Sequence, residues 1–158
     1  MKTLILYYSY GGNTRKIAQL LRQEIGGDLE EIETVKPYIG SYNESVEQGE
    51  REVSDGFMPE IKPLRSDVAS YDRIVLGSPV WWYTFAPAIK TVLHQSDLSG
   101  KIIDPFATNG GWIGHTFKDY EKACPHAVVQ KGLNVRFDEN RLQTNEQIIR
   151  EWAALLKE

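Results

Sequence analysis

The 158-residue sequence predicts a three-layer α/β fold, in which a doubly wound parallel sheet of five strands lies between two layers of helices. Two observations support this prediction. Short strand-like apolar segments alternate along the chain with segments of helical periodicity, which implies crossover connections and parallel strands. In addition, the first such segment, residues 3–8, is strand-like and apolar over its whole length, as expected for a strand buried on both faces.

A helix is expected directly after this first strand. Thr14 is a suitable N-cap, and Gly26-Gly27 ends the helix. Its apolar residues recur at helical spacing at Ile17, Ala18, Leu21 and Ile25. Leu29 and Ile32 belong to a short second strand. Prolines and glycines then interrupt residues 35–65, where one helix over residues 43–53 is expected.

The second half of the chain continues the alternation. Three further strands are expected, over residues 72–77, 101–108 and 127–135. Pro105 removes one hydrogen-bond donor from the second of these strands, and Gly132 weakens the third. Pro87 occupies the first position of a helix over residues 87–94. Thr144 and Gln147 form a capping box for a C-terminal helix.

Composition limits the classes of protein that the chain can belong to. Its length indicates a single domain over residues 1–158, and no apolar run approaches the roughly 20 residues of a membrane span. Cys124 is the one cysteine, so an intrachain disulfide is impossible and a cytoplasmic location is expected. The three histidines lack the spacing of metal ligands, and no metal site is expected. The net charge of −4 argues against a nucleic-acid partner.

The acidic residues are unevenly distributed. Between Glu24 and Glu60, eleven acidic residues face only Lys36 and Arg51, which gives this segment a local charge of 2 − 11 = −9. One interpretation is a solvated helix and loop. The other is an electrostatic docking face for a basic partner.

The segment after the first strand has the parts of an anion-binding loop, and it comprises Ser9, Tyr10, Gly11, Gly12, Asn13 and Thr14. The two glycines allow a tight turn and close approach of the backbone to a ligand, and the following helix presents free N–H groups. Ser9 and Thr14 add hydroxyl donors. The loop lacks the lysine of NTPase loops and the GxGxxG pattern of dinucleotide sites, so the phosphate monoester of a larger cofactor is expected. A glycine-rich turn without a ligand is the alternative.

Residues 5–21, ILYYSYGGNTRKIAQLL, resemble the N-terminal signature of the flavodoxin family. The fixed positions of that signature are satisfied by Ile5, Leu6, Tyr7, Ser9, Gly12, Thr14, Ala18 and Leu21. The resemblance implies a flavodoxin-like fold and non-covalent binding of FMN. It also implies that residues 9–14 bind the phosphate.

Two aromatic loops follow later strands, over residues 77–83 and 108–114. A tryptophan taken alone more often belongs to the core or the surface than to a cofactor site. Tryptophan beside glycine at a strand end, however, suits the binding of a flat ring. The Pro-x-Trp-Trp segment that starts at Pro79 resembles one flavodoxin-like subfamily. The resemblance implies that the flavin ring is bound by Pro79, Val80, Trp81, Trp82, Tyr83, Thr108, Asn109, Gly110, Gly111, Trp112 and Gly114.

The resemblance implies a redox function in which the flavin carries the electrons. In one hypothesis, the protein is an enzyme that uses NAD(P)H to reduce a quinone or similar small acceptor. In the other, it is a single-electron carrier that docks to partner proteins. Electron carriers of this family use a glycine beside the ring for a peptide flip, and residues 81–84 contain none, which favours the enzyme.

Three further hypotheses stay open at this point. No side chain is required as a nucleophile or base, although His115 is a candidate proton donor near the ring. By analogy with two-electron reductases, the protein forms a homodimer. A flavodoxin-like interaction module that binds no flavin is also possible, because fold alone does not determine function.

Overall fold

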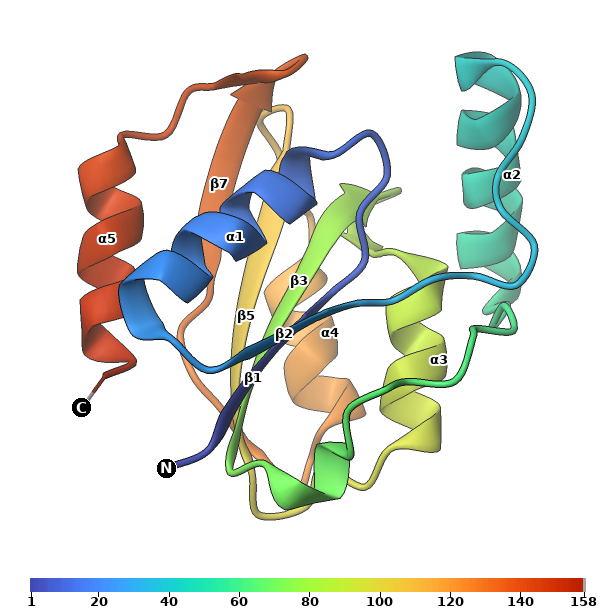
Figure 1. The fold of residues 1–158 in the computed structure, drawn as a ribbon. Coiled ribbons are helices and arrows are strands. Elements are labelled where there is room, and N and C mark those ends of the chain that lie inside the picture. The colour runs from blue at the N-terminus through green and yellow to red at the C-terminus, as the bar shows by residue number, and fades with distance from the viewer. Residues whose placement is uncertain (158) are drawn as a thin grey trace.

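The computed structural model describes residues 1–157, which form a mostly parallel sheet with helices on both faces (Figure 1). Its five main strands lie in the order β2-β1-β3-β5-β7, with parallel pairing throughout. They span Thr3–Tyr7 (β1), Asp28–Glu31 (β2), Arg73–Trp81 (β3), Ile102–Asn109 (β5) and Leu133–Asp138 (β7). The predicted fold class is therefore confirmed. Because the strand order reverses between β1 and β3, the carboxyl ends of these strands flank a switch point, where such sheets bind ligands.

Three two-residue strands raise the total above the five that were predicted. They are β4 (Thr84–Phe85), β6 (Val128–Val129) and β8 (Arg141–Leu142). The predicted strand over residues 127–135 is divided into β6 and β7, with Gly132 outside both. A Cβ atom on Gly132 would lie 2.6 Å from Cδ1 of Phe117, so this stretch of chain passes too close to the Phe117 ring for a larger residue.

The helices cover the sheet on both sides (Figure 1). Helices α1 (Asn13–Ile25) and α5 (Glu146–Leu155) pack on one face, and α3 (Pro87–Gln95) and α4 (Thr116–Ala123) pack on the other. Helix α2 (Tyr42–Asp55) lies beyond the carboxyl end of β3, next to α3, and a short 3-10 turn (Val68–Ser70) precedes β3. None of the helices in residues 1–157 is long and apolar enough to cross a membrane.

Helix α1 begins two residues earlier than its predicted cap requires. Gly12, in a left-handed conformation, occupies the N-cap position, so Thr14 lies inside the first turn. The Thr14 side chain is buried, and its Oγ1 atom lies 2.8 Å from Oγ1 of Thr108 at the end of β5. Thr14 therefore links α1 to the central sheet and does not cap the helix.

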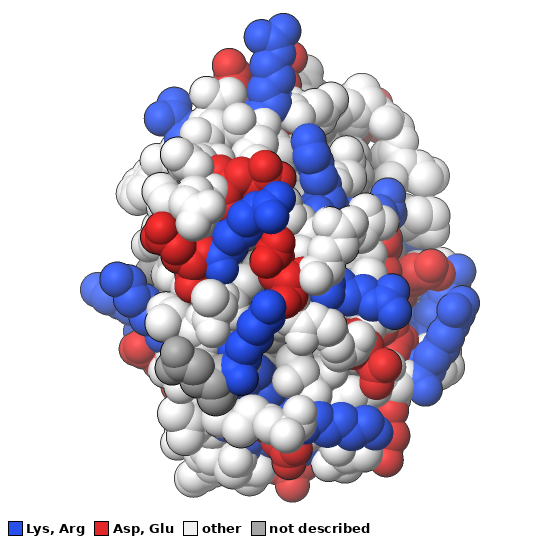
Figure 2. Space-filling model, turned by 60° about the vertical axis from the view of Figure 1, so that its left-hand side comes forward, with Lys and Arg blue, Asp and Glu red and all other residues white. Residues whose placement is uncertain are grey.

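The N-cap of α5 is Asn145 and not Thr144. The Asn145 side chain accepts a 2.8 Å hydrogen bond from the backbone N–H of Gln147, while the Thr144 hydroxyl accepts from the backbone N–H of Arg136 in β7. An ion pair of 3.0 Å between Arg150 and Glu24 joins α5 to α1. On the face that carries α5, acidic and basic side chains are intermixed (Figure 2).

Strand β3 extends to Trp81, four residues beyond its predicted end at Gly77. Proline at position 79 is tolerated because β1 has already ended. The Gly77 carbonyl accepts from the N–H of Tyr8, and Pro79 lies two residues further on the same side of the strand, where β1 offers no partner in the described structure. Most of the first predicted aromatic loop is therefore strand, and only Trp82 and Tyr83 form the turn to β4.

Pro105 is accommodated inside β5 for a related reason. Ile102 and Ile103 pair with β6, whereas β5 from Phe106 onward pairs with β7. Pro105 lies between these two stretches, so its missing N–H falls at the break between two neighbouring strands.

Gly77 is required in the centre of the sheet by its neighbour on β5. It pairs directly with Phe106, and a Cβ atom on Gly77 would lie 2.6 Å from Cε1 of the Phe106 ring. We expect Gly77→Ala to lower the free energy of unfolding by about 1–3 kcal/mol, because overpacking a filled core forces side chains out of their rotamers. Urea unfolding measures this change.

Gly110→Ala is the matched control for this substitution. No described atom lies within 4 Å of a Cβ at Gly110, and we expect a change within about 0.5 kcal/mol. Equal stabilities of the two variants would contradict the close packing at Gly77.

Asp104 and Arg73 form a buried ion pair on the face covered by α1 and α5, with 3.1 Å between Arg73 Nη1 and Asp104 Oδ2. Burial raises the pKa of the Asp104 carboxyl to about 6, and Arg73 opposes this shift. In the unfolded chain an Asp carboxyl has a pKa of about 3.9. Because the folded state holds the proton more tightly, the ionisation of Asp104 lowers stability as pH rises from about 4 through about 6.

We therefore expect the stability difference between Asp104→Asn and the wild type to depend on pH. As pH decreases from 7 to 5, the unfolding free energy of the wild type should rise by about 1 kcal/mol relative to that of the variant. The reason is that protonation of Asp104 restores stability in the wild type, whereas the asparagine of the variant cannot be protonated in this range. Urea unfolding at both pH values tests this, with Asp55→Asn on the exposed side of α2 as the control. A difference that does not vary with pH would show that Asp104 is already ionised at pH 5.

Candidate functional site

A cleft of about 400 Å³ lies at the carboxyl ends of β3 and β5 and is closed on one side by α2. This is the size range of ligand-binding pockets. Nine of the residues predicted to bind a cofactor line it, and they are Tyr10, Asn13, Pro79, Val80, Trp81, Trp82, Thr108, Asn109 and Gly110. The fold therefore brings the loop after β1 together with parts of both aromatic segments.

The loop between β1 and α1 leaves backbone N–H groups open to a ligand. Gly11 and Gly12 have φ angles of 82° and 96°, and a Cβ on either would meet no described atom within 4 Å. The N-cap residue, Gly12, has no side chain that could accept from the N–H groups at the start of α1. Ser9 Oγ accepts from the N–H of Arg15 at 3.2 Å, and Asn13 Nδ2 donates to the carbonyl of Glu139 at 2.8 Å. A helix start with free N–H groups beside open space can hold an anion.

The basic residue nearest to this loop is already paired. Arg15 forms a two-point contact with Glu31, with 2.7 Å from Nε to Oε1 and 2.8 Å from Nη2 to Oε2. The hydrogen bond from Arg15 lowers the pKa of Glu31, and the Tyr7 hydroxyl also donates to Glu31 at 3.0 Å. Burial and Glu31 raise the pKa of Tyr7 to about 12. Backbone amides, rather than the Arg15 charge, are therefore available to an anion in the loop.

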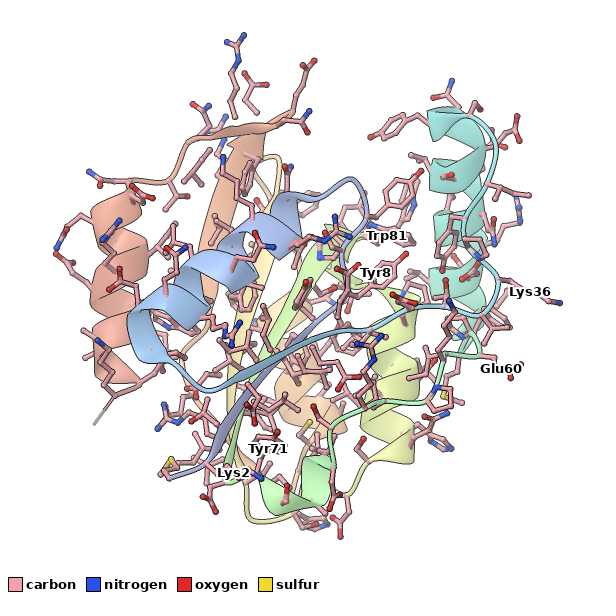
Figure 3. All side chains as sticks on the ribbon, in the orientation of Figure 1. Lys2, Tyr8, Lys36, Glu60, Tyr71 and Trp81 are labelled. Atoms are coloured by element: carbon pink, nitrogen blue, oxygen red, sulfur yellow. The ribbon has the colours of Figure 1, made fainter. Side chains whose placement is uncertain are left out.

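Trp81 forms the wall of the cleft between the loop after β1 and α2. Three tyrosine rings pack against it edge to face, with centroid distances of 5.9 Å to Tyr8, 5.7 Å to Tyr10 and 5.0 Å to Tyr38. Figure 3 shows Tyr8 and Trp81 together between the sheet and α2. From the side of α2, Gly49 approaches so closely that a Cβ there would lie 3.2 Å from Cε3 of Trp81.

The turn after Trp81 has a strained backbone. Trp82 and Tyr83 have φ angles of 49° and 73°, in a two-residue hairpin turn where asparagine and glycine are preferred. The Tyr83 carbonyl accepts from the N–H of His115 at 2.8 Å. A Cβ on Gly114 would lie 2.5 Å from Cα of Tyr83, so only glycine lets the second aromatic segment approach this turn. Contacts between the two segments therefore hold the turn in place.

The remaining predicted residues lie outside the cleft lining. They are Ser9, Gly11, Gly12, Thr14, Tyr83, Gly111, Trp112 and Gly114. The rings of Tyr83 and Trp112 pack together at 4.6 Å, and Trp112 is 67% exposed. Next to this pair, the Asp119 carboxylate contacts both Nδ1 of His115 and the hydroxyl of Thr84.

Part of the cleft lining was not predicted from the sequence. Helix α2 contributes Tyr42, Ser45, Val46 and Gly49. Phe137 in β7 and Glu139 in the turn after β7 also line the cleft. Helix α2 was expected over residues 43–53 as part of the acidic segment, but no role in the cofactor site was assigned to it. Its signal was the pair of small residues at i and i+4, Ser45 and Gly49, in an otherwise acidic helix. Such a pair leaves space for a bulky neighbour, and in the fold that neighbour at Gly49 is Trp81.

Comparison with solved structures identifies several similar folds. A protein from Bacteroides eggerthii assigned as a flavoprotein is 31% identical, with a TM-score of 0.83 over 98% of this chain and 96% of that chain. A flavoprotein from Lactobacillus acidophilus, crystallised in complex with FMN, is 29% identical, with a TM-score of 0.74 over 84% of this chain and 91% of that chain. Oxidised flavodoxin 2 from Bacillus cereus shares the fold at 22% identity, with a TM-score of 0.60 over 98% and 96% of the two chains.

No curated protein sequence matches this chain significantly. The sequence profile of the flavodoxin family, in contrast, matches residues 2–153, which is almost the whole chain. Together with the strand order and the glycine-rich loop at the switch point, this match shows that the chain belongs to the flavodoxin family.

Proposed function

We propose that this protein binds FMN non-covalently in the cleft and functions as a redox flavoprotein. The observation that carries the proposal is the position of the cleft, which adjoins the glycine-rich start of α1 and the ends of β3 and β5. A similar flavoprotein, from L. acidophilus, was crystallised with FMN. When bound, FMN supplies the capacity to accept and release electrons, while the protein positions the cofactor and sets its surroundings.

The phosphate group would be bound by residues 9–14. The open concave backbone at Gly11 and Gly12 and the N–H groups at the start of α1 suit a phosphate. The Ser9 hydroxyl and the backbone N–H groups of Tyr10, Asn13 and Thr14 would add further donors, because the side chains of Asn13 and Thr14 already have partners. Because Arg15 is paired with Glu31, most of the attraction comes from amides and the helix dipole.

The flavin ring would lie against the ends of β3 and β5. Trp81 and Trp82, with Pro79 and Val80, offer an apolar wall, while Thr108, Asn109 and Gly110 offer polar groups. Beyond them, Tyr83, Gly111, Trp112 and Gly114 would form the outer edge of the site. The exposed Tyr83–Trp112 pair is suited to contact a flat second reactant.

We favour an enzyme that uses FMN to reduce a quinone or similar small acceptor, with NAD(P)H as the electron donor. The Tyr83 carbonyl is held by His115, and the Trp82 indole donates to the carbonyl of Val46 at 3.1 Å, so the turn beside the ring resists a peptide flip. A homodimer belongs to the same proposal. The alternative, a single-electron carrier, is favoured by the exposed carboxylates of Glu44, Glu47 and Glu50 on α2, beside the cleft.

Titration of the apoprotein with FMN and with riboflavin tests the cofactor assignment. We expect quenching of flavin fluorescence by both ligands, with FMN bound at least tenfold more tightly, because riboflavin lacks the phosphate. Gly12→Ala should remove most of this difference, since the Ala side chain disfavours the left-handed backbone that shapes the loop.

Gly100→Ala is the control for backbone strain. Gly100 also has a positive φ and an open environment, but it precedes β5 at the other end of the sheet. This variant should bind both flavins like the wild type. Absence of quenching by either flavin with the wild-type protein would refute the redox function and leave an interaction module.

Reductive titration of the FMN-bound protein distinguishes the two uses of the cofactor. We expect reduction in a single two-electron step, together with NAD(P)H oxidation that depends on added quinone. Two well-separated one-electron steps without quinone-dependent NAD(P)H oxidation would instead favour the electron carrier.

A further inference from the structure

Helix α2 forms one wall of the cleft, although it packs on neither face of the sheet (Figure 1). Contacts with the end of β3 hold it there. Gly49 lies against the Trp81 ring, and Nε1 of Trp82 donates to the Val46 carbonyl. Near the C-terminal end of the helix, the buried Glu52 carboxylate accepts from the Tyr38 hydroxyl at 2.6 Å and from Gln48 Nε2 at 2.7 Å. Contacts within the protein therefore hold α2 in place without a ligand.

Ser45 is the most buried polar residue that α2 contributes to the cleft lining. It is 3% exposed and lines the cleft together with Trp81, Asn109 and Gly110. Its hydroxyl has no hydrogen-bond partner within residues 1–157. A serine inside a helix commonly bonds back to the carbonyl four residues earlier, but the Ser45 hydroxyl does not make that bond to Ser41.

A buried hydroxyl without a partner is uncommon in native proteins because its desolvation is not compensated. The other buried side-chain atoms of this kind in residues 1–157 belong to the Arg73–Asp104 pair and to Tyr120, which lie outside the cleft lining. Ser45 is thus the one that adjoins the space available to a ligand. The hydroxyl oxygen is itself covered in this structure, so a ligand in the cleft can supply the missing partner once the Ser45 side chain rotates toward it.

We propose that the Ser45 hydroxyl hydrogen-bonds a polar edge of the flavin ring, which makes α2 a third ring-binding segment besides the ends of β3 and β5. This inference rests on the proposed binding of FMN. The ring of a flavin carries carbonyl oxygens and ring nitrogens at one edge, and a hydroxyl can donate to or accept from such groups. The contact is to the ring, so FMN and riboflavin share it.

Ser45→Ala tests the contact by flavin titration. We expect the dissociation constants of FMN and of riboflavin to rise by the same factor, about five- to tenfold, as for loss of one hydrogen bond. The visible absorption bands of the bound flavin should also shift, because a hydrogen bond at the ring edge is lost. Ser54→Ala, on the exposed side of α2, is the matched control and should change neither property.

The stability of the apoprotein separates this role from a structural one. Because Ser45→Ala removes an unsatisfied buried hydroxyl, we expect the Tm of the apoprotein to stay unchanged or to rise. A lower Tm of the apo variant would mean that the hydroxyl supports the fold, and unchanged flavin affinities would mean that it does not touch the ring. Either result overturns the inference. Failure of the wild type to bind FMN is a separate outcome, which refutes the proposed function and the inference with it.

Discussion

The packing around Trp81 is the interaction on which the rest of the cleft depends. One indole contacts the loop after β1 through Tyr10, the segment after β2 through Tyr38, and α2 through Gly49. Each edge-to-face aromatic pair contributes about 0.5–1.5 kcal/mol beyond its buried area. Trp81 is therefore a shared contact of three segments that have no strand pairing with the end of β3. This arrangement explains why a helix that covers neither face of the sheet can still form a wall of the site.

The position of Trp81 depends in turn on the length of β3. The strand continues past the end of β1 and turns back through Trp82 and Tyr83, two residues that disfavour the left-handed backbone they adopt. Such strain persists where surrounding contacts determine the conformation. Here the close approach of Gly114 and the hydrogen bond from His115 provide those contacts. The two aromatic segments are therefore joined by direct contacts and are not two independent loops.

The sequence was sufficient to predict the alternation of strands and helices, the parallel sheet and the loop at residues 9–14, because these depend on local periodicity and on glycine. The extension of β3 was missed because Pro79 and the tryptophans resemble a turn, and the reason that they form a strand, the early end of β1, is a tertiary property. The role of Thr14 was also wrongly predicted because it depends on tertiary structure. Its hydroxyl bonds to Thr108, which is far away in the sequence, and does not cap α1. The contribution of Ser45 depends on the placement of α2, which no local pattern specifies.

The acidic segment illustrates how folding redistributes charge. Six of its eleven acidic side chains have partners within the fold, namely Glu24, Asp28, Glu30, Glu31, Glu33 and Glu52. The carboxylates of Glu44, Glu47 and Glu50 stay exposed on α2, next to the cleft. Electrons added to a cofactor in the cleft would be repelled by these charges, but water weakens the repulsion from exposed groups, and at about 0.1 M salt it decays over about 10 Å. The groups that touch the cofactor, which water does not screen, should therefore influence its potential more than the acidic face of α2 does.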